Sequence, residues 1–265
     1  MRSILNHLLT TCLLGGSLLV GSSAVHADSM VAVTAKFSME KTPVTQGEPA
    51  ILQITFDNRS GHGVVINLGY EDEKLDITVV DPDGQVSHKP TPTLREGWGP
   101  VDAFVAAAGE TSPGSVSLSD WFVFKKVGTY RIDVSLSPIS SPKEPFTYRI
   151  SGNHAALTLT VLPRDEGSLD SACADLLSRV EDLHSSASAL TAAKALSSIK
   201  DPVAVPYIAT AIKRREFASM MITALSRLKT DQAVAALVEA SKSEDPETKM
   251  LARSALAGIA DSDKR

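Results

Sequence analysis

The chain has 265 residues, of which 43% are hydrophobic and 22% charged, and its formal net charge is -5. This composition excludes a disordered or fibrous chain, and the length leaves room for about two domains. A nucleic-acid binder would carry a basic patch to neutralise phosphates. The longest basic run, Lys213-Arg214-Arg215, is only three residues in an acidic chain, so we expect no nucleic-acid partner.

Residues 1–27 have the features of a cleaved secretory signal peptide. Arg2 provides a small positive start, an apolar stretch runs from Ile4 to Val20, and Val25-His26-Ala27 places small residues at the cleavage-determining positions. We therefore expect a mature chain that begins near Asp28 and resides in the periplasm or is secreted. The segment is short and rich in Gly and Ser, and no second apolar run follows, so we expect no membrane span in the mature chain.

The two cysteines raise separate questions. A lipid anchor on Cys12 is an alternative to cleavage after Ala27, but Leu9-Thr10-Thr11 lacks the small residue that a lipobox needs before the cysteine. Cys173 is then the single thiol of the mature chain, which excludes an internal disulfide. We expect Cys173 to be a small apolar side chain packed in a helix interface, with an intermolecular disulfide as the alternative.

Residues 28–163 are predicted to form a domain of β-strands, because apolar residues alternate with a period of two. Turn chemistry separates the runs at Asn58-Arg59-Ser60-Gly61 and Asp81-Pro82-Asp83-Gly84, and eleven of the 14 prolines lie at or before Pro163. Short strands with turns between them predict an antiparallel β-sandwich or barrel. The alternating runs are Val31 to Met39, Leu52 to Phe56, Val64 to Leu68, Leu75 to Val79 and Leu157 to Val161.

A Gly turn followed by Tyr130 gives the sharpest indication of fold within this domain. Gly128-Thr129-Tyr130 opens an alternating strand, where the Tyr130 ring can enter the core while its hydroxyl bonds to the preceding loop. This motif resembles the tyrosine corner of immunoglobulin-like domains. The resemblance implies an antiparallel immunoglobulin-like β-sandwich of the kind found in exported bacterial proteins.

Aromatic residues are densest at Trp121-Phe122-Val123-Phe124. Neighbouring residues of a strand face opposite ways, so Trp121 and Phe122 could not both enter one core. We expect a strand that is covered on both sides, with an exposed platform for stacking a ligand as the alternative.

Residues 164–167 are the predicted linker, and residues 168–262 are the predicted helical domain. Beyond Pro163 the apolar period becomes helical, as in Leu176, Leu177, Val180 and Leu183. Asp245-Pro246 and Thr230 or Asp231 are suited to begin helices, since an Asp or Thr cap accepts from free amides and Pro tolerates the first turn. The pattern predicts about six helices, or three pairs.

One phrase, Ala-Leu-x-x-Ile/Leu, occurs three times in the helical domain. It begins at Ala195, Ala224 and Ala255, in steps of 29 and 31 residues. Such a period is typical of a helical solenoid. The phrase resembles HEAT-like repeats of the phycobilisome-lyase type, which implies a stacked scaffold for protein contacts and does not imply lyase activity. The predicted fold class is thus an immunoglobulin-like β-sandwich followed by a short HEAT-like α-solenoid of about three helix pairs.

Catalytic motifs give no positive indication of an enzyme. The sequence has no His-Glu-x-x-His, no Gly-x-Ser-x-Gly and no phosphate-binding Gly loop. We therefore expect no enzyme, no cofactor and no metal. Calcium held by Glu71-Asp72-Glu73 with Asp76, or by Asp81 and Asp83, is a less favoured reading.

The favoured function is a non-enzymatic, extracytoplasmic protein-binding or assembly module. In each predicted helix pair, the apolar residues of the second helix must pack inside the stack. The basic residues that remain on these second helices form the candidate protein-binding surface: Lys194, Arg227, Lys249 and Arg253. Such a row would steer an acidic protein partner. Two alternatives stay open. One is a protease inhibitor of immunoglobulin-like type that uses an ordered loop at residues 90–100. The other is a subunit of an extracytoplasmic hydrolase, whose site would draw on Asp83, His62, His88 and Glu71.

Overall fold

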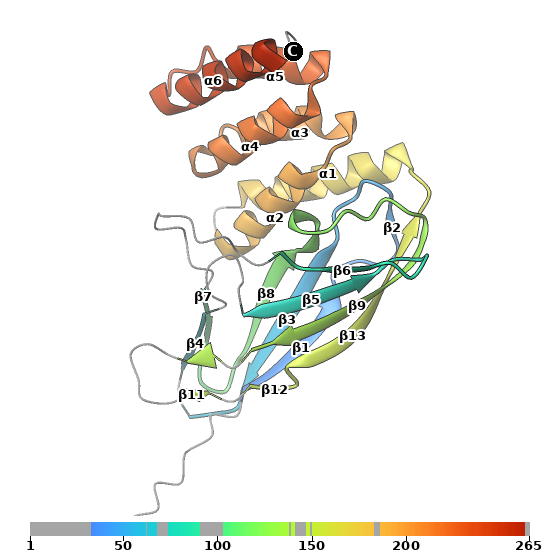
Figure 1. Cartoon of the computed structure of the whole chain (residues 1–265). Helices are drawn as coiled ribbons and strands as arrows, with labels where there is room; N and C mark the ends of the chain where they lie inside the picture. Colours follow the sequence, from blue (N-terminus) through green and yellow to red (C-terminus); the bar gives the residue numbers. More distant parts are fainter. Residues whose placement is uncertain are drawn as a thin grey trace, which may run out of the picture.

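The computed structural model describes residues 33–61, 63–67, 74–90, 103–137, 139–140, 147–148, 150–182 and 186–262. A strand-rich part comes first and a helical part follows it (Figure 1). The predicted signal peptide at residues 1–27 lies outside the described residues.

A four-stranded sheet forms one layer of the strand-rich part. Its order is β12-β1-β3-β8, in which β1 pairs antiparallel with β3 and β3 with β8, whereas β12 runs parallel to β1. The bounds are Val33–Met39 for β1, Ile51–Asn58 for β3, Thr111–Ser117 for β8 and Ile150–Ser151 for β12.

A five-stranded sheet has the order β2-β13-β9-β5-β6, and here β2 runs parallel to β13. Its strands are β2 (Val44–Thr45), β5 (Leu75–Val80), β6 (Val86–His88), β9 (Gly128–Leu136) and β13 (His154–Leu162). Two further antiparallel pairs consist of β4 (Val64–Asn67) with β7 (Ala103–Ala106), and β10 (Ile139–Ser140) with β11 (Thr147–Tyr148).

Both large sheets are therefore mixed, and the predicted fold class is wrong. The chain does not form an antiparallel immunoglobulin-like β-sandwich followed by a HEAT-like solenoid; it forms mixed sheets followed by helices. The alternating apolar residues correctly located the long strands, but this pattern does not show whether a strand pairs parallel or antiparallel with its neighbour. The parallel partners β2 and β12 have two residues each, too few to display any period.

The local prediction for Tyr130 is confirmed although the fold built on it is not. Tyr130 is buried at the start of β9, and its hydroxyl accepts a hydrogen bond of 2.8 Å from the Lys126 backbone N–H. The Phe124 ring meets the Tyr130 ring edge-on, with 5.2 Å between centroids. The motif ties the loop before β9 to the core shared by the sheets.

The aromatic cluster does not form the predicted strand. Trp121 follows a short 3₁₀ turn, η2 (Leu118–Asp120), and residues 122–125 are irregular. Phe122 and Phe124 are buried while Val123 between them is 57% exposed. The ammonium of Lys89 lies 4.8 Å from the Trp121 ring centroid, so part of that ring is already occupied by a cation–π contact.

Helices stack above the strands in three layers, with α2, α4 and α6 succeeding one another on one side and α1, α3 and α5 on the other (Figure 1). Caps predicted at two helix starts are confirmed: the Thr230 hydroxyl accepts from the Ala233 N–H, and the Asp245 carboxylate from the Thr248 N–H. The bounds are α1 (Glu166–Glu181), α2 (Ser186–Ser198), η3 (Pro202–Ala204), α3 (Val205–Ala211), α4 (Arg215–Leu228), α5 (Asp231–Ala240) and α6 (Pro246–Ser262).

The core of the helical part contains Cys173, which is fully buried as predicted. Burial, with a smaller contribution from nearby acidic groups, raises the pKa of this thiol to about 12. The thiol is therefore protonated at neutral pH and unreactive. None of the described helices combines the length and the apolarity needed to cross a bilayer.

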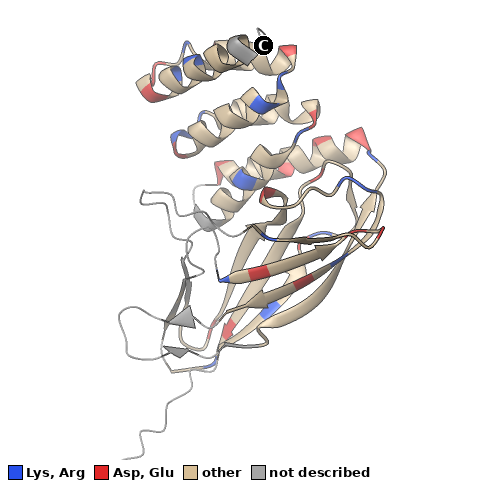
Figure 2. Ribbon diagram, in the orientation of Figure 1, with Lys and Arg blue, Asp and Glu red and all other residues tan. Residues whose placement is uncertain are grey.

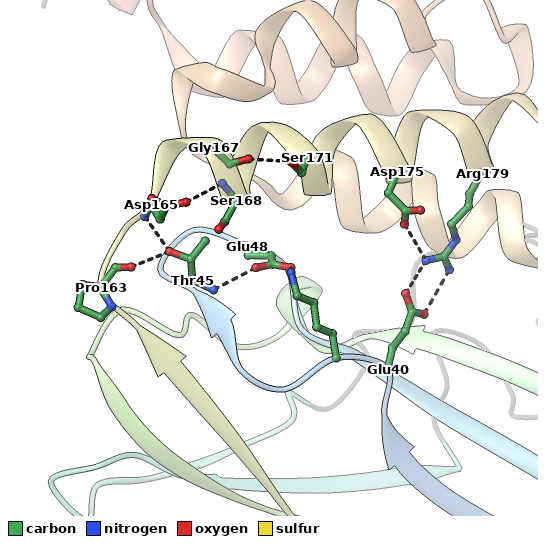
Figure 3. A network of polar contacts seen from close by, with 11 residues as sticks. Glu40, Thr45, Glu48, Pro163, Asp165, Gly167, Ser168, Ser171, Asp175 and Arg179 are labelled. Carbon is green, nitrogen blue, oxygen red and sulfur yellow. Dashed lines mark hydrogen bonds and ion pairs between the residues drawn. The ribbon is translucent and has the colours of Figure 1, made fainter.

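Polar contacts join α1 to the strand-rich part (Figure 3). The Thr45 hydroxyl donates to the Pro163 carbonyl at 2.7 Å and accepts from the Asp165 N–H at 2.8 Å. The Arg179 guanidinium donates to both carboxylate oxygens of Glu40, at 2.5 and 3.4 Å. The predicted linker at residues 164–167 is consequently short and anchored, since Glu166 begins α1.

Apolar packing continues across the same junction. Ile51 lies on β3, yet it belongs to the buried cluster of the helical part together with Cys173 and Leu176. On α2, the Thr191 hydroxyl donates to the Ser115 carbonyl of β8 at 3.0 Å. The strand-rich and helical parts thus share an interface with both apolar and polar contacts.

Candidate binding groove at the junction of strands and helices

A hollow of about 860 Å³ lies where η2 meets α2 and α4. A second hollow of about 340 Å³ adjoins it, because both are lined by Ser119, Val123, Ser198 and Lys200. We call the two together the junction groove. Its lining residues are Gln46 to Pro49, Ser119 to Lys125, Arg164, Lys194, Ser197 to Asp201, Met220, Ala224, Arg227 and Leu228.

Backbone hydrogen bonds fix the strand-side wall, which follows β8. The Leu118 N–H donates to the Ala50 carbonyl, and the Ser119 hydroxyl accepts from the Ala50 N–H, both at 2.9 Å. Leu118 itself is fully buried in the core of the sheets. At the other end of the wall, the Gln46 side chain donates to the Lys125 carbonyl at 2.5 Å. The wall is therefore preorganised, with the exposed Val123 side chain between two fixed ends.

The helix-side wall comes from α2 and α4. Lys194 lies on α2 and Arg227 in the last turn of α4, and Lys200 follows α2. Met220 and Leu228 are half-buried apolar residues of the same wall. The groove thus combines cationic and apolar groups on the helical side.

Asp120 is the acidic residue of the larger hollow. The residue keeps a solvent-exposed surface, but the protein around its carboxyl group desolvates it and raises its pKa to about 6. The positive charges of Lys194 and Arg227 act in the opposite direction, as does the nearby Ser117 hydroxyl. Ser117 Oγ is buried and forms no hydrogen bond of standard geometry within the described residues, so the charge of Lys194 is the main opposing influence.

Replacing Asp120 by Asn is expected to change the pH dependence of stability. Because the folded-state pKa is raised, the folded protein binds more protons than the unfolded chain between about pH 4 and 6, and wild-type stability falls as pH rises through this window. Asp120→Asn should remove this slope and stabilise the protein at pH 7 by less than about 1 kcal/mol, since the group is exposed to solvent. Urea unfolding at several pH values measures both effects.

Asp76 offers a matched control for that measurement. It is an exposed aspartate on β5 and does not line the junction groove. Asp76→Asn removes a carboxylate outside the groove, so the slopes of the two variants are compared with each other and with wild type. An unchanged slope in Asp120→Asn would show that the hollow does not perturb Asp120.

The predicted positive series is divided between two places. Figure 2 shows basic positions on each of α2, α4 and α6, but only Lys194 and Arg227 line the larger hollow. Arg253 stands two residues before the phrase at Ala255, and its counterparts at the same offset, Ala193 and Ile222, are buried whereas Arg253 is exposed. Lys249 and Arg253 therefore lie on a face of α6 that no described helix covers.

Sequence reasoning missed Asp120 and Lys200, and it singled out Trp121 and Val123 only as part of an aromatic cluster. Residues 120, 194 and 227 lie far apart in the chain, and no spacing connects them. The sequence offered one indication. In a strand, the neighbouring apolar side chains of Trp121-Phe122-Val123-Phe124 would point to opposite faces, so they could not all enter one core, which indicates an irregular segment against a second layer.

The other predicted sites do not converge on the groove. Lys126 Nζ lies 2.5 Å from a carboxylate oxygen of Asp81 and 2.6 Å from one of Asp83, and hydrogen bonds from Lys126 help to hold the pKa of Asp81 below its usual value. His88 Nδ1 is 3.1 Å from the Thr78 hydroxyl. The acidic run at residues 71–73, His62 and residues 91–100 of the suggested inhibitory loop lie outside the described residues.

No family model matches the chain, and a search of curated proteins found no match. Solved structures give weak likenesses. A β-glucosidase from Listeria innocua in complex with isofagomine is 15% identical over 51% of this chain and 16% of its own length, with a TM-score of 0.31. A GH3 β-glucosidase from Bifidobacterium adolescentis is 17% identical over 53% and 20%, with a TM-score of 0.25. The chain thus spans about a fifth or less of these proteins, and likenesses of this size assign neither fold nor activity.

Proposed function

We propose that this chain is a non-enzymatic protein-binding or assembly module that acts in the periplasm or outside the cell, and that the junction groove receives a segment of the partner protein. The observation that supports the proposal most is the composition of the groove. Trp, Met and Arg are enriched at the centres of protein interfaces, and Trp121, Met220 and Arg227 line one hollow. The extracytoplasmic location is proposed from the signal-like segment at residues 1–27.

The form of the groove is suited to a chain segment. Two adjoining hollows of about 860 and 340 Å³ share lining residues, and they have one wall from each part of the protein. Val123 adds apolar surface at the point that the hollows share, and it is 57% exposed. Burying such a side chain under a partner would remove apolar area from water, which favours association.

Site-specific photocrosslinking tests this proposal. A photoreactive amino acid is placed at Val123, and in a second variant at Met250, which is 62% exposed on α6 beside Lys249. The two positions are matched in exposure but lie on different surfaces. With the variants expressed in the producing cell and exported, we expect a discrete crosslinked partner from position 123 and none from position 250.

The outcomes separate the two candidate surfaces. A discrete product at position 250 alone would move binding to the uncovered face of α6 and contradict the groove. Absence of a discrete product at both positions would contradict the function as a binding module.

A further inference from the structure

The larger hollow of the groove concentrates positive charge on an acidic chain. Lys194, Lys200 and Arg227 line it together with a single carboxylate, Asp120, although the whole chain has a formal net charge of -5. The three cations come from α2, the turn after it and α4, so the arrangement is created by the stacking of the helices on η2. A concave surface with one sign of charge focuses its field on an oppositely charged ligand.

Arg227 and Lys200 are available to a ligand. Both are exposed and form no ion pair within the described residues. Other arginines are already paired with carboxylates: Arg164 with Asp201 at 2.7 Å and Arg179 with Glu40 at 2.5 Å. The side chains of Arg227 and Lys200 are therefore cationic hydrogen-bond donors that a ligand in the groove can use.

Apolar surface lies beside these cations. Val123 faces the hollow from the strand side, and Met220 and Leu228 line it from α4. An occupant that satisfies both kinds of group needs carboxylates and apolar side chains in close succession. An extended peptide provides this, because successive side chains point in opposite directions.

We propose that the junction groove binds an extended acidic segment of a partner protein, whose carboxylates pair with Lys200 and Arg227 while an apolar side chain packs on Val123 and Met220. The inference rests on the proposed function and specifies the chemistry of its partner. Nucleic acid is disfavoured because its sugar–phosphate backbone carries no apolar side chain to pack on Val123 and Met220.

Asp120 makes this binding depend on pH. The groups that face it are Lys194 from α2 and Arg227 from α4, with Ser117 on its own segment. When ionised, Asp120 repels an acidic segment and competes for Arg227; when protonated near pH 6 and below, it does neither. Binding of the segment should therefore tighten as pH falls through about 6, down to the pH at which the carboxylates of the segment are themselves protonated.

Fluorescence anisotropy with a short labelled peptide that alternates Glu and Leu tests the inference on the full mature chain. Peptides that alternate Gln with Leu and Lys with Leu, and a single-stranded oligonucleotide, are the comparison probes. We expect the Glu–Leu peptide to bind best and to weaken with salt. Lys200→Gln with Arg227→Gln should weaken it about tenfold, as for two partly exposed ion pairs. Lys249→Gln with Arg253→Gln is the matched control and should leave affinity unchanged.

Each result decides one point. Equal or absent binding of the Glu–Leu and Gln–Leu peptides, equal loss in both double variants, or tighter binding of the oligonucleotide would overturn the acidic-segment inference. The proposed function would survive these results if position 123 still crosslinks a discrete partner. Urea unfolding of the double variants verifies that they fold. If the Lys200 change is not tolerated, the single variant Arg227→Gln, on an exposed residue, still tests the inference.

Discussion

Replacing Tyr130 by Ala is expected to lower the free energy of unfolding by about 3 to 5 kcal/mol, the usual cost of truncating a buried aromatic residue. The ring is buried in the core of the sheets and meets Phe124 edge-on. Truncation leaves a cavity there and also removes the acceptor for the Lys126 N–H, which is bonded to the Tyr130 hydroxyl at 2.8 Å. Equilibrium unfolding in urea, followed by tryptophan fluorescence, gives the loss.

Tyr130→Phe separates the ring from its hydroxyl. The ring and its packing remain, and one hydrogen bond is lost, so the expected cost is about 0.5 to 1.5 kcal/mol. Equal and negligible losses in both variants would mean that the ring is not in the core. Because Lys126 follows the wall of the junction groove, Tyr130→Phe should also increase amide exchange in residues 123–126 more than elsewhere.

Ile51→Ala is expected to destabilise the protein by about 2 to 5 kcal/mol and to uncouple its two parts. Ile51 lies on β3 but is buried among helical residues such as Leu176. The chain has two tryptophans, at 98 and 121, both before the helices. Trp121 lines the groove against α2 and α4, so fluorescence responds to both parts of the protein. Amide exchange of β9 at increasing urea reports on the strand-rich part, and far-ultraviolet circular dichroism reports mainly on the helices. In wild type the two urea transitions should coincide; in Ile51→Ala the helical transition should come first.

Ile54→Ala is the matched control, because Ile54 lies on the same strand and is fully buried in the core of the sheets. A loss of similar size is expected, but here the transition of β9 should not lag behind the helical one. Proteolysis supplies a second readout: cleavage between Pro163 and Ser168 should be slow in wild type and faster in Ile51→Ala. Coincident transitions in Ile51→Ala would mean that the polar contacts at Arg179 and Thr45 suffice for coupling.

Local features were predictable wherever one short segment contains all the information. The caps at Thr230 and Asp245, the burial of Cys173 and the corner at Tyr130 each depend on residues within a few positions, and the structure confirms them. The prediction that all strands pair antiparallel was wrong. The strands that pair in parallel begin at Val44 and Ile150, and they are too short to show an alternating apolar pattern.

The groove depends on contacts that no local pattern encodes. Lys194 and Arg227 could be singled out as polar positions on helices with an apolar stripe, but Asp120 gave no signal. Its proximity to them follows from α2 packing on η2, and that packing involves long-range contacts such as Thr191 to the Ser115 carbonyl. In the sequence, Lys249 and Arg253 looked equivalent to Lys194 and Arg227, because all four lie near a copy of the Ala-Leu-x-x-Ile/Leu phrase. They differ in the structure because one face of α6, the last described helix of the stack, is left uncovered.

The two parallel pairs have a consequence for how the chain folds. β12 closes the four-stranded sheet beside β1, and β2 sits beside β13 at the edge of the five-stranded sheet. Each sheet joins residues near position 40 to residues beyond position 149, and Thr45 contacts Pro163 across 118 positions. Closing so long a loop before any contact is gained slows folding. During synthesis the early strands must therefore wait, with their edges unpaired, until the segment just before α1 has emerged. This interval is when the chain is most exposed to aggregation and when a holding chaperone would matter most.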